Sequence, residues 1–165
     1  MTSSPVFCVL GAGSWGTALA SHLARCGHPV TLWGRSASDM QAMAESGCNE
    51  RYLPGCSLDT SLSFSSDLEA SLRTCSEVLV SVPSHSFAAM VEQINAHAPA
   101  QCRVLWACKG FEPQTRGLLS EVAADKRPQQ AHAIVSGPSF AAELVAGLPT
   151  AVTVASNTED YARQV

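Results

Sequence analysis

Short apolar runs alternate along the chain with segments in which apolar residues recur at helical spacing. Seven runs predict strands, at 5–10, 28–33, 61–64, 77–83, 103–110, 132–138 and 150–156. The segments between and after them predict helices at 14–26, 38–46, 87–98 and 115–125, with two more beginning at 139 and 157. Three of the runs, 77–83, 103–110 and 132–138, are almost uninterrupted apolar stretches that end in glycine or proline. Such runs are typical of parallel strands that are buried on both faces.

This alternation predicts an α/β fold with a Rossmann-like, doubly wound and mostly parallel sheet that carries helices on both faces. The chain has 165 residues and is 46% hydrophobic, which is enough for one domain with a sizeable core. We therefore treat residues 1–165 as one domain. No apolar run reaches the length of a membrane-spanning helix, and the first residues lack the pattern of a secretory signal. A cytoplasmic location without membrane insertion is the expectation.

Composition narrows the classes of ligand. The seven cysteines are scattered and include no C-x-x-C pair, so we expect reduced, mostly buried thiols and neither a disulfide framework nor a metal site. The formal net charge is −4 and no basic stripe is interleaved with aromatic residues, which argues against nucleic acid as the main partner. Local hydrogen-bond donors can still hold a small anion.

The strongest local signal is the sequence GAGSWG, in which Gly11, Gly13 and Gly16 form a G-x-G-x-x-G pattern. The pattern directly follows a predicted strand and opens a predicted helix, which is the context of a dinucleotide-binding turn. The first glycine permits the tight bend, the second lets backbone amides approach a diphosphate, and the third allows the helix to pack closely on the strand. A merely flexible loop is the alternative, and the surrounding βαβ unit favours the phosphate site.

Three neighbouring residues bear on which dinucleotide fits. Ser14 and Trp15 lie on the turn, so their amides are candidate donors, and the Trp15 ring either covers the cofactor or packs on the sheet. At the end of the second strand, where NAD-selective folds place a carboxylate, the sequence reads WGRS and offers Arg35 instead. A guanidinium can donate paired hydrogen bonds to a 2′-phosphate. We therefore infer NADP (NADPH) as the cofactor, with NAD also allowed. A solvated surface charge is the alternative for Arg35.

Later strand ends supply further candidates, since ligands of open α/β sheets bind at the carboxyl ends of the strands. Lys109 follows an apolar strand as a flexible cation suited to a phosphate or to polarising a carbonyl oxygen. Gly137 and Ser139 lie in a turn that leads into a helix, where amides and a hydroxyl can hold a small polar ligand. Plain N-capping is the alternative for Ser139.

Five segments, GAGSWGTALA, NERYLPG, SVPSHSF, CKGFEPQT and SGPSFAAELVAGLPTAVTVAS, closely resemble the bacterial type of NAD(P)-dependent glycerol-3-phosphate dehydrogenases. They occur in matching order from near residue 6 to residue 156. The resemblance implies reduction of dihydroxyacetone phosphate to sn-glycerol 3-phosphate, which feeds phospholipid synthesis. It also implies a cofactor site lined by Ser14, Trp15, Arg35, Tyr52, Lys109 and Ala141. Substrate contacts are implied for Lys109, Gly137 and Ser139.

In that family a second, all-helical domain supplies a lysine proposed as the proton donor or acceptor, and an Arg-Asn pair that grips the substrate phosphate. Those positions lie beyond Val165, so we expect the cofactor-binding domain alone, with no catalytic residue of its own and without turnover. The resemblance allows a homodimer for a full-length protein. Two alternatives stay open: another Rossmann dehydrogenase of the hydroxyacid or ketopantoate type, and a non-catalytic NADP-binding module.

Overall fold

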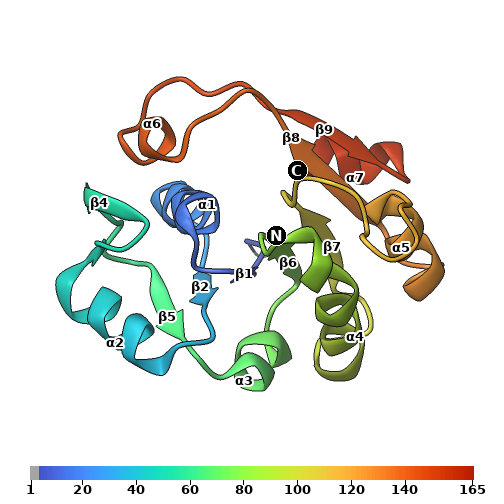
Figure 1. Ribbon diagram of the computed structural model, residues 1–165, viewed down its shortest axis with the longest axis horizontal. Helices are drawn as coiled ribbons and strands as arrows, with labels where there is room; N and C mark the ends of the chain where they lie inside the picture. The colour runs from blue at the N-terminus through green and yellow to red at the C-terminus, as the bar shows by residue number, and fades with distance from the viewer. Residues whose placement is uncertain (1–3) are drawn as a thin grey trace.

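The computed structural model describes residues 4–165. The strands of its main sheet are β1 Phe7–Leu10, β2 Val30–Trp33, β5 Ser63–Ser65, β6 Glu77–Val80, β7 Arg103–Trp106, β8 His132–Ser136 and β9 Thr153–Ser156. They lie in the order β5-β2-β1-β6-β7-β8-β9 (Figure 1). Neighbouring strands are parallel except β8 and β9, which are antiparallel. The predicted mostly parallel sheet is confirmed.

Helices cover both faces of this sheet, as predicted (Figure 1). They are α1 Ser14–Arg25, α2 Ala37–Ser46, α3 Leu68–Arg73, α4 Phe87–His97, α5 Leu119–Lys126, α6 Ala141–Val145 and α7 Glu159–Gln164, with a 3-10 turn η1 at Ser84–Ser86. Residues of α1 and α7 pack in the core on one face, and residues of α3, α4 and α5 in the core on the other. The helix α6 lies over α1, and the Arg25 guanidinium holds it through the carbonyl oxygens of Leu144 and Val145 at 2.8 and 2.9 Å.

Side chains of the central strands alternate between the two cores. In β6, Val78 and Val80 belong to the core that contains Phe87 of α4, whereas Leu79 belongs to the core that contains Ala20 of α1. Because successive side chains of a strand point to opposite faces, a strand covered on both sides must be apolar at every position. This requirement explains the uninterrupted apolar runs, and each fully buried valine or leucine contributes about 1.5–3 kcal/mol to folding.

One departure from the prediction lies between β7 and α5. The helix expected at 115–125 begins only at Leu119, because the preceding residues form a turn. There the Glu112 carboxylate accepts hydrogen bonds from the amide and the hydroxyl of Thr115, at 2.6 and 2.9 Å, and Arg116 has a positive φ of 58°. These bonds to Glu112 hold the pKa of its carboxyl below the ordinary value.

Other predicted boundaries also move. The helix expected from 139 begins at Ala141, with Phe140 as N-cap residue and no side-chain cap, so Ser139 does not cap it. The strands expected at 103–110 and 150–156 shorten to β7 and β9. The segment 49–67, rich in turn formers, was expected to hold one short strand. It also forms most of a two-stranded hairpin, β3 Cys48–Asn49 and β4 Leu53–Ser57, and α3 follows it without having been predicted.

The connections place a crevice at the centre of the sheet. The chain runs from β1 outward to β2 and β5, and then returns to the other side of β1 as β6. Such a reversal separates the loops after β1 and β6, and ligands of open α/β sheets bind between them. The hairpin and α2 lie beside β5, at the same side of the molecule (Figure 1). Among residues 4–165, no helix combines the length and apolar character needed to span a bilayer.

Candidate functional site

The three glycines of the turn after β1 meet different surroundings. Gly11 has a φ of +115°, and a Cβ there would lie 2.5 Å from the Ser81 carbonyl oxygen. A Cβ on Gly16 would lie 2.0 Å from the Gly11 carbonyl oxygen, so α1 packs directly on the turn. A Cβ on Gly13 would meet nothing within 4 Å. Gly11 and Gly16 are therefore required by the backbone, whereas Gly13 leaves open space beside the chain.

The first turn of α1 presents free backbone donors. Gly13 is the N-cap residue, no side chain caps the helix, and its first turn carries no acidic residue. The first hydrogen bond of the helix runs from the Thr17 amide to the Gly13 carbonyl at 3.0 Å. The preceding amides have no intrahelical acceptor, and the dipole of this 12-residue helix favours negative charge at this end. The arrangement suits an anion such as a phosphate group.

A cleft of about 1040 Å³ opens beside this turn; we call it the larger cleft. Five segments line it: the turn at Gly11 to Gly13, the end of β2 with Arg35, residues of α2, the β3–β4 hairpin with Tyr52, and the loop after β6 with the start of α4. Its volume reaches the upper end of the roughly 300–1,000 Å³ that is usual for small-molecule clefts. The cleft therefore has room for an extended ligand along the carboxyl ends of β1, β2 and β6.

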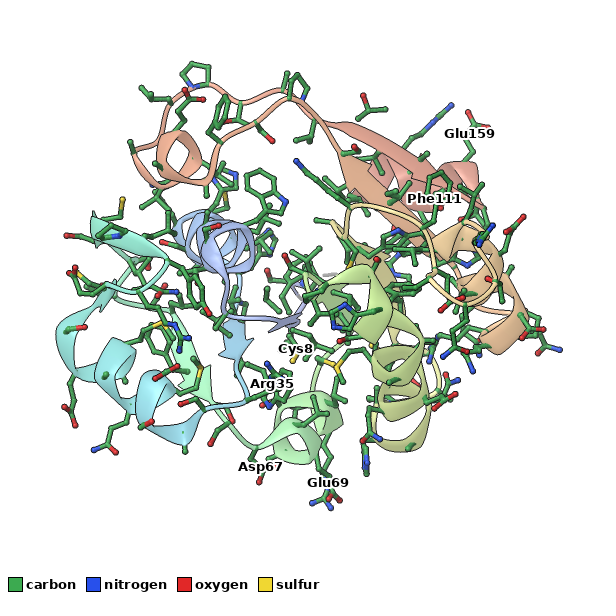
Figure 2. The ribbon with its side chains drawn as sticks, in the orientation of Figure 1. Cys8, Arg35, Asp67, Glu69, Phe111 and Glu159 are labelled. Atoms are coloured by element: carbon green, nitrogen blue, oxygen red, sulfur yellow. The ribbon has the colours of Figure 1, made fainter. Side chains whose placement is uncertain are left out.

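Charges in the larger cleft are unevenly paired. The Asp39 carboxylate, at the start of α2, lies 3.4 Å from the Arg51 guanidinium, which in turn lies 5.2 Å from the centre of the Tyr52 ring. Arg35 is exposed and forms no ion pair within residues 4–165. Its guanidinium is thus free for an anionic ligand. Figure 2 shows Arg35 far from the β7–α5 loop that carries Phe111.

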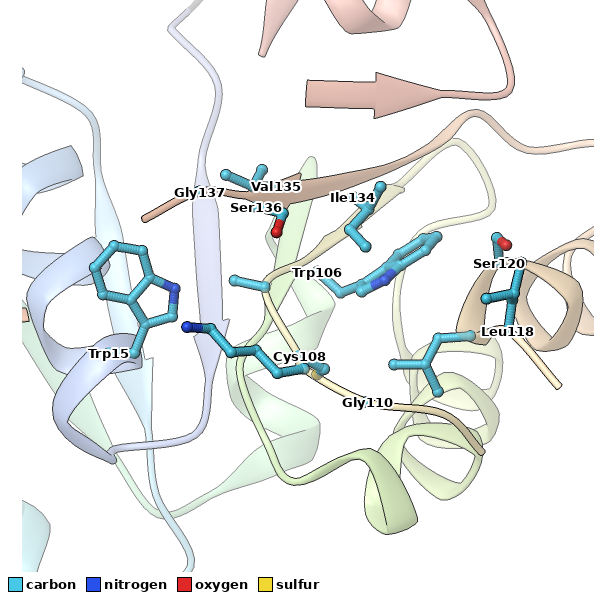
Figure 3. A pocket seen from close by; sticks show the side chains of 13 residues that line it. Trp15, Trp106, Cys108, Gly110, Leu118, Ser120, Ile134, Val135, Ser136 and Gly137 are labelled. Atoms are coloured by element: carbon cyan, nitrogen blue, oxygen red, sulfur yellow. The ribbon is translucent and has the colours of Figure 1, made fainter. Parts of the chain in front are cut away.

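A second, smaller cavity of about 410 Å³ lies at the ends of β7 and β8; we call it the smaller cavity. Its lining includes Trp15, Trp106, Lys109, Leu118 and Gly137, and Figure 3 shows Trp15 on the side opposite Trp106 and Leu118. Lys109 is the one basic side chain of this lining. The neighbouring Cys108 is a neutral thiol near pH 7, because burial raises its pKa to about 11.

The residues that the sequence singled out divide between these two hollows. Gly11, Gly13, Arg35 and Tyr52 line the larger cleft, and Trp15, Lys109 and Gly137 line the smaller cavity. The lining of neither includes Ser14, Gly16, Ser139 or Ala141. Ala141 packs instead against the small core between α1 and α6.

Neither the cysteines nor the potential metal ligands of the described residues form a further site. All seven cysteines are free, and four of them, Cys8, Cys75, Cys102 and Cys108, are buried, so the prediction that most of the thiols are buried is confirmed. In the described part of the chain no three residues of the metal-binding types come together.

Sequence reasoning missed one buried polar residue at the larger cleft. Asn49 is 2% exposed, lines the cleft and bonds to the carbonyl of Ala12 inside the glycine turn, at 3.1 Å. Within the segment NERYLPG the family resemblance implies a role for Tyr52 alone. A bond between residues 37 positions apart leaves no local signal in the sequence.

Comparisons with known proteins agree on the family. Residues 6–162 match the sequence profile described as the N-terminus of NAD-dependent glycerol-3-phosphate dehydrogenase. The chain is similar to a glycerol-3-phosphate dehydrogenase [NAD(P)+] of Thioalkalivibrio sulfidiphilus, with 48% identity over 164 residues that make up 99% of this chain and 49% of the relative. It is also similar to a Stenotrophomonas maltophilia protein of the same name, with 46% identity over 99% of this chain and 48% of the relative.

The fold agrees as well. A crystal structure of glycerol-3-phosphate dehydrogenase from Coxiella burnetii superimposes with a TM-score of 0.90 and 39% sequence identity, over 98% of this chain and 49% of that one. The chain thus spans about half the length of the curated relatives that it matches.

Proposed function

The chain belongs to the family described as the N-terminus of NAD-dependent glycerol-3-phosphate dehydrogenase, and on this premise we propose that it binds an NAD(P) dinucleotide in the larger cleft. The smaller cavity holds part of the substrate. The reaction is the reduction of dihydroxyacetone phosphate to sn-glycerol 3-phosphate, which supplies phospholipid synthesis. Membership of this family favours this reaction over the hydroxyacid and ketopantoate alternatives.

The surroundings of Gly13 are the observation that carries the proposal. A diphosphate must come close to the backbone at the start of α1, and the space that a Cβ of Gly13 would occupy is empty. The amides of the first helical turn, including those of Ser14 and Trp15, have no side-chain cap that competes for them. The residues present therefore fit the diphosphate of a dinucleotide.

The second hollow adjoins the same helix end. Trp15 follows Ser14 in the first turn of α1 and lines the smaller cavity, so that a dinucleotide held at the turn can extend its nicotinamide toward Lys109. A bound reduced nicotinamide supplies the hydride. The Lys109 ammonium would then hold an oxygen of the substrate and stabilise the negative charge that develops on it. Gly137 borders the same cavity. The contacts of Ser139 with the substrate and of Ala141 with the cofactor are proposed from the family resemblance alone.

Arg35 makes NADPH the preferred cofactor in this proposal, because its unpaired guanidinium can form two parallel hydrogen bonds to a 2′-phosphate. Calorimetric titration of the chain with NADPH and with NADH tests this point. We expect NADPH to bind at least about tenfold more tightly, and Arg35→Leu to remove the difference while NADH affinity stays the same. NADH binding as tight as NADPH binding would refute the role of Arg35.

We also propose that these 165 residues on their own bind the nucleotide without turnover. Hydride transfer needs a proton donor within reach of the substrate oxygen, and Cys108 and Lys109 are the ionisable side chains that line the smaller cavity. Lys109 is already assigned to the substrate oxygen, and the Cys108 thiol is buried. Oxidation of NADPH with dihydroxyacetone phosphate, compared with a full-length relative, tests this. A comparable rate would contradict it.

We also propose a cytoplasmic location. The seven free thiols support a cytoplasmic location, because reducing compartments keep cysteines unpaired. For a full-length protein we propose a homodimer.

A further inference from the structure

Asn49 carries a buried side-chain amide beside the larger cleft. Its side-chain Nδ2 donates to the Ala12 carbonyl at 3.1 Å and to the Thr17 hydroxyl at 2.8 Å, and its Oδ1 accepts from the Tyr52 amide at 3.2 Å. A buried side-chain amide needs partners for both of its ends. Here two partners lie in the glycine turn and the first turns of α1, and the third lies in the hairpin of Asn49 itself, so one side chain joins the hairpin to the turn.

These partners share a relation to the glycine turn. Ala12 lies between Gly11 and Gly13, Thr17 follows Gly16 in α1, and Tyr52 lines the larger cleft from the β3–β4 hairpin. In a trans peptide the carbonyl and the amide of one unit point in opposite directions. The bond to the Ala12 carbonyl therefore also fixes the direction of the Gly13 amide. Without it this peptide, which has a glycine on its amide side, is less restricted in its orientation.

We propose that Asn49 is a positioning residue that orients the peptide between Ala12 and Gly13 for a diphosphate and ties the Tyr52 hairpin to the same turn. This proposal rests on the proposed function of the larger cleft. It goes further by assigning a role in binding to a residue whose side chain is 2% exposed. Preorganised donors bind an anion more tightly than donors that must first be ordered.

Three nucleotides separate this role from a general effect on folding: NADPH and ADP, which contain a diphosphate, and adenosine 2′-monophosphate, which does not. Calorimetry on Asn49→Ala should show NADPH and ADP binding weakened by about tenfold or more. The affinity for the 2′-monophosphate should stay within about twofold of that of the unmodified chain. Asn49→Asp should weaken the diphosphate ligands further, because it adds a negative charge and sets a carboxylate oxygen against the Ala12 carbonyl.

Two variants guard against misreading a loss of fold. Thr17→Val keeps the shape of a buried side chain and removes one of the three hydrogen bonds of the Asn49 side chain. It should therefore weaken the binding of NADPH and ADP by about threefold and leave the binding of the 2′-monophosphate unchanged. Asn157→Ala is the matched control. The Asn157 side chain also bonds to backbone: it donates to the Gln130 carbonyl at 3.1 Å and accepts from the His132 amide at 2.9 Å. It lies outside the larger cleft. It should leave all three affinities unchanged.

The outcomes separate cleanly. Equal weakening of all three nucleotides by Asn49→Ala and by Thr17→Val, or no weakening at all, would overturn the positioning role and leave the proposed function standing. Failure of the unmodified chain to bind NADPH and ADP would overturn the proposed function and, with it, this inference. If Asn49→Ala does not fold, the selective loss in Thr17→Val decides the question.

Discussion

The larger cleft and the smaller cavity differ in what forms their walls. The larger cleft is bounded by a turn whose glycines are fixed by backbone contacts, and by Asn49, whose polar groups are all bonded. The smaller cavity depends on the exposed Lys109 and borders a loop that leaves Phe111 and Leu118, at 62% and 53% exposure, uncovered. Under the proposed function, the chain completes the walls of the nucleotide site and supplies only part of the walls of the proposed substrate site.

The difference shows that the two hollows need different parts of a fold. Backbone donors at a helix N-terminus need only the strand, the turn and the helix that carry them. A site for proton and hydride transfer needs side chains from several segments within about 3 Å of the reacting atoms.

Gly16→Ala should be the most damaging single substitution. The added Cβ would lie 2.0 Å from the Gly11 carbonyl oxygen, and a backbone atom cannot rotate away. We expect a loss of about 3 kcal/mol in the free energy of unfolding, despite the better helix propensity of alanine. Urea denaturation measures this loss. Ala20→Gly is the control within the helix. Gly27→Ala is less suitable as a control, because Gly27 has a φ of +86°. An unchanged midpoint would show that α1 does not pack on the turn as described.

Lys109→Ala should affect the smaller cavity far more than the larger cleft. Loss of a charge-assisted hydrogen bond should weaken binding of dihydroxyacetone phosphate to the NADPH-saturated chain by about tenfold or more, while NADPH affinity falls by less than about threefold. Titration calorimetry measures both. Lys126→Ala is the matched control, because that ammonium is paired with Glu92 at 2.6 Å and does not line the cavity. Equal effects of the two lysine variants would remove Lys109 from the substrate site.

Acid should weaken the sheet beside the smaller cavity. His132 lies at the start of β8 with its ring 5.8 Å from the Trp106 ring, and burial lowers its pKa below the ordinary value. A lowered pKa means that the unfolded chain takes up the proton first, so the stability that the neutral ring contributes is present above about pH 6.5 and is lost as pH falls. We expect a decrease of less than about 1 kcal/mol between pH 7 and pH 5.5.

Urea denaturation at several pH values measures this decrease, and His132→Phe should make the slope over that interval smaller. If the slope were the same in both proteins, the protonation of other groups would account for it.

The fold was largely predictable because its signals are local. Uninterrupted apolar runs identified the buried central strands, and the glycine pattern located the turn between β1 and α1. The predictions failed where side chains competed with secondary structure. The bonds from Thr115 to Glu112 delay the start of α5, and the polar segment after α2 gives little periodicity although it forms the β3–β4 hairpin.

The candidate site was predictable residue by residue only in part. Gly11, Gly13 and Arg35 stand at strand ends, where the topology of the sheet gathers ligands, and they do line one cleft. Their separation from Trp15 and Lys109, which line another cavity, could not be read from the sequence. Nor could the contribution of Asn49, because its bonds to Ala12 and Thr17 cross 37 and 32 residues of chain.

Gly13→Ala gives the most direct test of the central claim that the backbone at the start of α1 holds a diphosphate. Gly13 has a φ of −75°, which alanine adopts readily, and its added methyl would touch nothing in the protein within 4 Å. We predict an unchanged melting temperature together with NADPH binding weakened by at least about tenfold in titration calorimetry. NADPH binding as tight as in the unmodified chain would contradict the account.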